Sequence, residues 1–177
     1  GASEGGGDVL VVVRGPNEDQ TIRRKKKSAI IWINDTEVTF LDAPSYYFLA
    51  STRPLSEFLS DRIARKEQIG YPAMALKVKG FVDDYIIIED FRKALIRNKQ
   101  KQGLYGEGPG LVRYKGKHLF RTRLHFPANV PVGDYNIDIY VFKDGKIISK
   151  ESTILPVQKE GIGAQVYKFA HRHALSY

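Results

Sequence analysis

The stretch from Leu119 to Val157 constrains the fold of this chain more than any other part. Apolar and polar residues alternate along it, and the alternation resumes after the pair Asp144-Gly145. Alternation with a period of two is typical of strands with one buried face, and Asp-Gly between two such runs predicts a tight hairpin. The sequence therefore predicts an antiparallel β-structure with one face toward a core and one toward water.

A change of period interrupts the strands between about residues 54 and 106. Apolar residues recur at steps of three and four from Pro54 to Gly70, and again from Asp83 to Gln102. This spacing predicts two helices, each with one apolar stripe. The second helix has acidic residues near its start and basic residues near its end, an order that the helix dipole favours.

Together these patterns predict a mainly β fold with a helical insertion, which we interpret as an immunoglobulin-like antiparallel β-sandwich. The expected domain covers residues 1–162, with the insertion at about 54–106. The segment 163–177 carries apolar residues at helix-like spacing and predicts a terminal amphipathic helix. We also expect a tight turn at Asn34-Asp35, and a hairpin turn in the glycines that precede the strand at Asp8.

The composition narrows the class of protein. No apolar run approaches the ~20 residues that a membrane helix needs. The chain has no cysteine, which excludes thiolate metal sites, disulfides and thiol nucleophiles. Its formal net charge is +8, and this excess favours an anionic partner: nucleic acid, lipid head groups or an acidic protein.

Catalytic and metal-binding motifs are weak. None of the four histidines lies in a known nucleophile motif, and the glycines of Gly103–Gly110 leave a predicted helix instead of entering one, unlike a phosphate loop. His171 and His173 would point apart on a helix, although on a strand they could share an ion. We therefore expect no catalytic residue, no metal and no cofactor. An enzyme whose site holds His118 or His125 beside a carboxylate stays an alternative.

Two groups of basic residues are candidates for binding. The densest is Arg23, Arg24, Lys25, Lys26 and Lys27, which could contact an anionic surface or keep an exposed strand edge from aggregating. This run lacks the interleaved aromatic residues that stack on unpaired bases, which makes nucleic acid an unfavoured partner.

The second group follows from the alternation in Phe120–Phe126. If the phenylalanines at its ends face the core, then Arg121, Arg123 and His125 form a basic stripe on the outer face. Such a stripe could bind an acidic partner or could simply be solvated.

Several phrases occur in a characteristic order along the whole chain. They are DVLVVVRGP (8–16), IIWIN (30–34), PSYYFLASTRPL (44–55), FRKALIR (91–97), QGLYGE (102–107), LFRTRLHFPANVPVGDYNIDIYVFKDG (119–145) and VYKFAHRHALSY (166–177). Together they resemble the alphaproteobacterial putative transmembrane protein family. The resemblance implies an envelope protein with a signal segment, a periplasmic domain and one membrane helix near the C-terminus. It also implies genes near permeases that resemble sulfite exporters, and it supplies no catalytic residue.

The phrases of this resemblance include arginines that lie beside aromatic residues, a frequent chemistry of contact surfaces. With the outer stripe, they complete the expected partner-binding set: Arg14, Arg53, Arg92, Arg121, Arg123 and His125. We expect a non-enzymatic periplasmic domain of a single-pass inner-membrane protein, with a permease or another envelope protein as partner. A basic nucleic-acid-binding domain is the first alternative, and the oligomeric state stays open.

Overall fold

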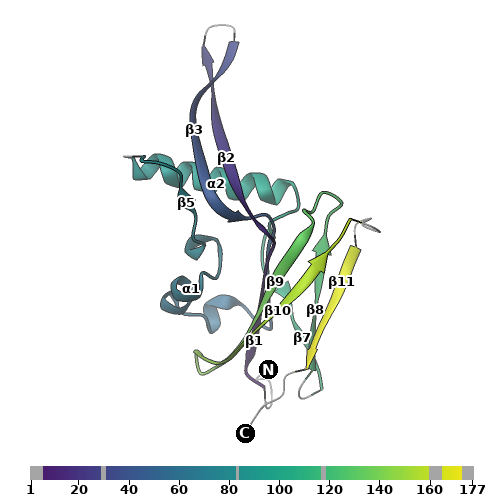
Figure 1. The fold of residues 1–177 in the computed structure, drawn as a ribbon. Helices are drawn as coiled ribbons and strands as arrows, with labels where there is room; N and C mark the ends of the chain where they lie inside the picture. The colour runs from purple at the N-terminus through teal and green to yellow at the C-terminus, as the bar shows by residue number, and fades with distance from the viewer. Residues whose placement is uncertain (1–5, 29–30, 83, 117–118, 160–164, 173–177) are drawn as a thin grey trace.

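The computed structural model describes residues 6–28, 31–82, 84–116, 119–159 and 165–172 (Figure 1). These residues form three sheets and a set of helices, so the predicted mainly β class is confirmed. The largest sheet has the order β10-β9-β1-β4-β6, and all its pairings are antiparallel except that of β4 with β6. Its strands are β1 (Asp8–Arg14), β4 (Tyr47–Ser51), β6 (Gly110–Leu111), β9 (Gly133–Lys143) and β10 (Lys146–Val157).

Strand β1 lies inside this sheet, with β4 on one edge and β9 on the other. Its run Val9–Val13 is buried on both faces, which explains why the run is apolar without alternation. The strand that the expected hairpin turn before β1 requires would lie before Gly6, outside the described residues, so that turn stays a prediction.

A second sheet packs against the first. It has the order β11-β8-β7, with β7 (Arg113–Lys115), β8 (Leu119–Phe126) and β11 (Gln165–Arg172). Side chains of β8 such as Phe120 and Leu124 join the same hydrophobic core as those of β1 and β9. The two sheets thus share one core, while an immunoglobulin-like arrangement of their strands stays a prediction.

Within the segment 163–177, the described residues Gln165–Arg172 form strand β11 and not the expected terminal helix. The apolar spacing of Val166, Phe169 and Ala170 suits a helix, but Val, Tyr and Phe are also strand-forming residues. Pairing with β8 supplies partners for the backbone groups along the edge of that strand. This long-range pairing decides between the two local possibilities. Residues 173–177 lie outside the described residues.

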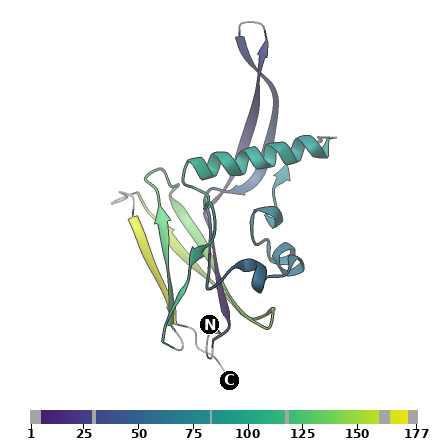
Figure 2. The ribbon, with the colours of Figure 1, turned by 180° about the vertical axis from the view of Figure 1, so that it is seen from behind.

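The third sheet forms an arm that extends from the body (Figures 1 and 2). It consists of β2 (Asn17–Ser28), β3 (Ile31–Pro44) and the short β5 (Lys77–Val78). Helix α2 (Tyr85–Lys101) lies across the base of the arm, and its Phe91 and Leu95 form a small core with Val38 and Phe40. The predicted apolar stripe of this helix is confirmed, and Asp84 caps its start.

The expected tight turn at Asn34-Asp35 is wrong because β3 runs through it. The register shifts there, from Arg24 opposite Thr36 to Lys25 opposite Asn34, so that Asp35 is the extra residue of a β-bulge. The backbone hydrogen bonds of the long β2–β3 hairpin thus accommodate Asp35 as a bulge, and the chain does not turn at this position.

All described helices lie between Leu55 and Lys101. The single helix expected from Pro54 to Gly70 is instead two pieces, the 3-10 helix η1 (Leu55–Glu57) and α1 (Asp61–Glu67), because Ser60 caps a new start with its side chain. A further 3-10 helix, η2 (Tyr71–Ala73), follows. These pieces cover the outer face of β9, so that strand is buried on both faces. Asp138 alternates with the apolar residues of β9 and would therefore be expected to face outward, but this layer buries it.

Candidate functional site

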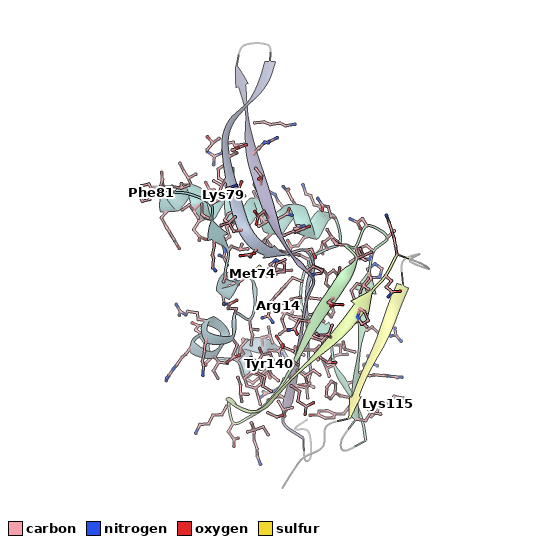
Figure 3. All side chains as sticks on the ribbon, in the orientation of Figure 1. Arg14, Met74, Lys79, Phe81, Lys115 and Tyr140 are labelled. Atoms are coloured by element: carbon pink, nitrogen blue, oxygen red, sulfur yellow. The ribbon has the colours of Figure 1, made fainter. Side chains whose placement is uncertain are left out.

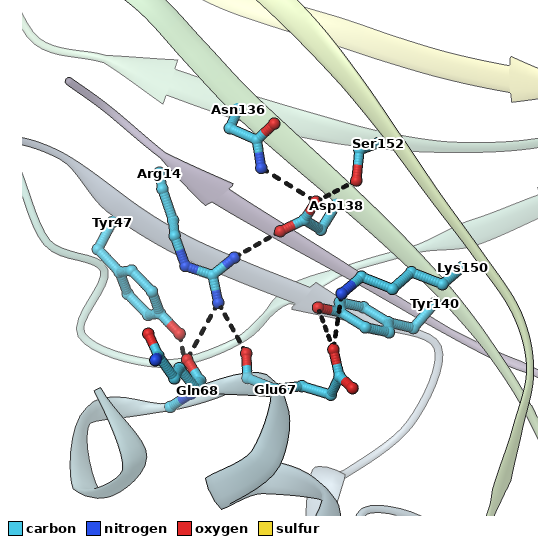
Figure 4. Close-up of polar contacts among 10 residues, drawn as sticks. Arg14, Tyr47, Glu67, Gln68, Asn136, Asp138, Tyr140, Lys150 and Ser152 are labelled. Carbon is cyan, nitrogen blue, oxygen red and sulfur yellow. Dashed lines mark hydrogen bonds and ion pairs between the residues drawn. The ribbon is translucent and has the colours of Figure 1, made fainter. Parts of the chain in front are cut away.

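Arg14 connects β1 to the residues that end α1 (Figure 4). Its Nη1 atom lies 2.6 Å from Oδ2 of Asp138, and its Nη2 donates to the backbone oxygens of Glu67 and Gln68 at 3.2 and 3.0 Å. Gln68 adopts the left-handed conformation that ends the helix, which turns its carbonyl toward the guanidinium. The arginine is thus used inside the domain to hold the helical layer on the sheet.

The carboxylate of Asp138 has further partners. Ser152 and Asn136 donate to its Oδ1 at 2.5 and 3.0 Å, while Oδ2 accepts from the arginine. Only 10% of the Asp138 side chain is exposed. A buried carboxylate is tolerated when it is paired and hydrogen bonded, as it is here.

A second ion pair lies beside the first (Figure 4). Lys150 of β10 donates to Oε2 of Glu67 at 2.7 Å, and its Nζ lies 5.2 Å from the centre of the Tyr140 ring. The hydrogen bond from Lys150 lowers the pKa of Glu67, and the same bond raises the pKa of Lys150. The four charges of the cluster therefore neutralise one another, and the cluster stabilises the junction of α1 with the sheet.

Arg53 and Arg92 also hold segments of this chain together. Arg53 makes a two-pronged contact with Asp8, at 2.6 and 2.8 Å, and its Nη1 donates to Glu57, which together raise its pKa. Arg92 of α2 donates through Nη2 to the backbone oxygens of Tyr71 and Met74. These bonds join β1 to η1 and α2 to η2.

The outer face of the β7–β8–β11 sheet is different. Arg121, Arg123 and His125 are exposed, as the alternation predicts, and Arg113 and Lys115 of β7 are exposed beside them. The sequences of the three strands contain no aspartate or glutamate. We call Arg113, Lys115, Arg121, Arg123 and His125 the basic face.

Like charges lie opposite one another on this sheet. Arg113 pairs in register with Arg121, and Arg123 pairs with Lys168 of β11. Among the described side chains, none of the three arginines takes part in an ion pair. Directly opposite like charges destabilise a sheet by about 0.2–1 kcal/mol per pair. The domain thus bears an unfavourable charge arrangement that an anionic ligand would relieve.

The run Arg23–Lys27 lies on β2 of the arm. Arg23 pairs with Glu37 at 2.9 Å across the hairpin, and both side chains are about 60% exposed. Arg24 lies 3.7 Å from Asp90 of α2 and stacks over the Phe91 ring. The structure therefore divides the run, since the arginines contact the base of the arm and the three lysines follow along the strand.

The family model described as "Putative transmembrane protein (Alph_Pro_TM)" matches residues 1–177. The chain belongs to this family. No curated protein and no solved structure matches it. Within the part of this Alph_Pro_TM chain that the structure describes, no helix is both long and apolar enough to cross a membrane.

Sequence reasoning missed two features of this Alph_Pro_TM chain. Lys99 of α2 is buried, with its Nζ 2.6 Å from Oε1 of Glu18 on β2. Its position four residues after Leu95, on the apolar stripe, was the available signal. The junction of Arg14 with Asp138 left no signal, because it joins residues far apart in the chain.

The described residues contain no group of three or more histidine, aspartate or glutamate side chains that could hold a metal ion. His171 lies on strand β11, where residues two apart share a face, but His173 lies outside the described residues. The expected helix is therefore wrong at His171.

Proposed function

We propose that this chain is a non-enzymatic interaction domain of a single-pass inner-membrane protein, located on the periplasmic side, and that its basic face binds an acidic segment of a membrane protein. A permease that resembles sulfite exporters is the candidate partner. Membership of a transmembrane family supports the membrane association. The observation that carries the proposal is the pairing of Arg113 with Arg121 and of Arg123 with Lys168, without any acidic residue on these strands.

The physical argument rests on charge and rigidity. Thr122 and Leu124 alternate with the exposed arginines and are buried in the core, so the strand backbone is held in place. Cations on a rigid strand need little ordering when a ligand binds, which favours recognition. Alternating strand positions along a bound acidic peptide would match the spacing of the basic residues. Charge complementarity of this kind increases the association rate and the specificity of an interface.

The other arginines argue for an interaction domain and against a catalytic one. Arg14, Arg53 and Arg92 are engaged by carboxylates or backbone oxygens of the same chain. The carboxylates of Asp138 and Glu67, whose side chains are largely buried, are likewise paired with cations. Their charges serve the junction between layers, whereas none of the ion pairs among the described side chains involves an arginine of the basic face.

The test is affinity capture from membranes with the full-length protein. The double variant Arg121→Glu/Arg123→Glu should lose its partner, with a fall in affinity of about tenfold or more. The matched control Lys143→Glu/Lys146→Glu changes the net charge equally at exposed sites on the β9–β10 turn and should keep the partner. Equal capture by both variants would refute the role of the basic face.

Two further outcomes would replace the proposal. Recovery of the full-length protein from the soluble cytoplasm would contradict the location. Salt-dependent binding of DNA or RNA that Arg121→Glu/Arg123→Glu abolishes would assign the basic face to nucleic acid instead. The net charge of +8 is what makes this second candidate worth testing.

A further inference from the structure

Two exposed leucines border the basic face. Leu119 is the first residue of β8 and shares its outer side with Arg121, since residues two apart on a strand point the same way. Leu111 of β6 shares that side with Arg113, because Val112 between them is buried and both neighbours are exposed. Leu111 and Leu119 are 53% and 37% exposed. The outer side of this sheet therefore combines cations with large apolar side chains.

The strand register fixes the order of these side chains. Lys115 pairs with Leu119, and Arg113 pairs with Arg121. Lys115 lies at the end of the sheet that is away from the arm (Figure 3). Leu111 lies two residues beyond Arg113 in the opposite direction. The two facing arginines thus lie between one leucine and the other, at the two-residue repeat of a strand, which is about 7 Å.

The backbone under this pattern is held in place. The hydroxyl of Thr122, a buried residue of β8, donates to the carbonyl oxygen of Leu111 at 3.1 Å. Strand β6 also pairs in parallel with Ala50 and Ser51 of β4. A preformed surface loses little conformational freedom when a ligand binds. Single exposed leucines are ordinary on protein surfaces, whereas two that flank a pair of like charges form a pattern that a ligand can match.

The chemistry of this pattern selects the ligand. Carboxylates would satisfy the arginines, but exposed ion pairs are weak and are screened by salt. Contact of an apolar residue with a leucine adds a contribution that grows with the apolar area removed from water. An extended segment repeats its sheet-facing side chains every second residue, with the same spacing as the strand beneath it. Such a segment can place acidic and apolar residues on matching partners at once.

We propose that the basic face recognises an extended segment of the pattern apolar-x-acidic-x-acidic-x-apolar, in which x is any residue. The carboxylates contact Arg113, Arg121 and Arg123, and the apolar side chains contact Leu111 and Leu119. This inference rests on the proposed function and names the feature of the partner that gives specificity, since charge alone would accept any acidic segment. A polyanion without apolar side chains would leave both leucines unused.

The test uses synthetic peptides and the 177-residue chain. One peptide has leucine at its first and seventh positions, glutamate at the third and fifth, and threonine between them. A second replaces both leucines by serine, and a third keeps the composition of the first but places its glutamates at adjacent positions. Fluorescence anisotropy of the labelled peptides should give an affinity about tenfold higher for the first than for either of the others.

Variants assign the contact. Leu111→Ser/Leu119→Ser should weaken binding of the first peptide by about tenfold and change binding of the second by about twofold or less. The matched control Ile148→Ser/Ile154→Ser removes two isoleucines that are 51% and 63% exposed on β10, and should leave binding of both peptides unchanged. Circular dichroism and a thermal melt show whether each variant keeps the fold. The comparison of peptides on the parent chain does not depend on any variant.

Failure of this inference can be told apart from failure of the proposed function. Equal binding of the three peptides, or no binding of any, would overturn the inference, as would equal effects of the leucine variant and its control. The proposed function would survive these results if capture of the partner is still lost in Arg121→Glu/Arg123→Glu, and would fail with the inference if capture is kept. Binding of phosphatidylglycerol vesicles that Leu111→Ser/Leu119→Ser abolishes, without binding of any peptide, would assign the face to lipid and overturn the inference.

Discussion

Replacement of Arg14 by methionine should destabilise the domain strongly. The side chains of Arg14 and Asp138 are 20% and 10% exposed and lie 2.6 Å apart. Removing one member of a fully buried pair costs about 3–5 kcal/mol, because the other charge stays buried without its partner. Here Asp138 keeps the hydrogen bonds from Asn136 and Ser152, which lowers this cost.

The loss extends to α1. Two backbone oxygens at the end of this helix, those of Glu67 and Gln68, also lose their donor in Arg14→Met, at about 1 kcal/mol each. The free energy of unfolding should therefore fall by about 2–4 kcal/mol, or the melting temperature by roughly 5–15 °C. Urea unfolding measures the first quantity and a thermal melt the second. Limited proteolysis should show earlier cleavage in Asp61–Gly70.

Two further variants make the reasoning refutable. Arg62→Met removes an exposed arginine from α1 itself and should change the free energy of unfolding by about 0.5 kcal/mol or less. Arg14→Met/Asp138→Asn removes both charges and keeps an acceptor for Ser152, so it should recover part of the loss. A coupling energy of about 1–3 kcal/mol is expected between the two sites. A coupling near zero, or equal effects of Arg14→Met and Arg62→Met, would refute the account.

Two other predictions concern pH and backbone conformation. Because Lys150 holds the pKa of Glu67 below its usual value, the contribution of this pair is present above that value and is lost as the pH falls toward the lowered pKa. Urea unfolding from neutral to acidic pH measures this contribution. Glu67→Gln should be less stable than the parent chain at neutral pH, by up to about 1 kcal/mol, and equally stable in acid. A difference in stability that does not change with pH would contradict this prediction. Gly133 has a φ of +139°, and a Cβ atom there would lie 2.6 Å from Cγ of Pro16. Gly133→Ala should lower the free energy of unfolding by about 2–4 kcal/mol, and Gly80→Ala, which has a positive φ but open space, by about 1 kcal/mol. Equal melting temperatures for the two alanine variants would contradict the packing argument.

The local sequence pattern correctly predicted those strands and helices whose tertiary contacts favour the same structure. The alternation along β8 correctly gave its buried and exposed sides. Asp144 and Gly145 both have positive φ, as a tight hairpin turn between β9 and β10 requires. The stripe of α2, which includes Phe91 and Leu95, packs on the arm. At these positions, local propensity and tertiary contact favour the same structure.

The wrong predictions share a different cause. The Gln165–Arg172 segment suits both a helix and a strand, and the open edge of β8 decided for the strand. Asn34-Asp35, a sequence typical of a turn, instead lies within a long hairpin, where Asp35 forms a bulge. Asp138 alternates with apolar residues as an outward position does, yet the α1 layer covers it. Each outcome depends on pairing or packing with another segment of the chain, which the local pattern of apolar and polar residues does not show.

For the candidate sites, the residue order alone determined where cations concentrate: on the outer side of β8 and along β2. It could not separate the arginines that hold this domain together from those that face outward, because both kinds lie in similar phrases. Tertiary structure separated them by bringing Asp138, Asp8 and the oxygens of Tyr71 to the arginines of other segments. The period of apolar residues can be read from neighbouring residues in the sequence, whereas the partner of a charged side chain depends on which distant segments the fold brings beside it.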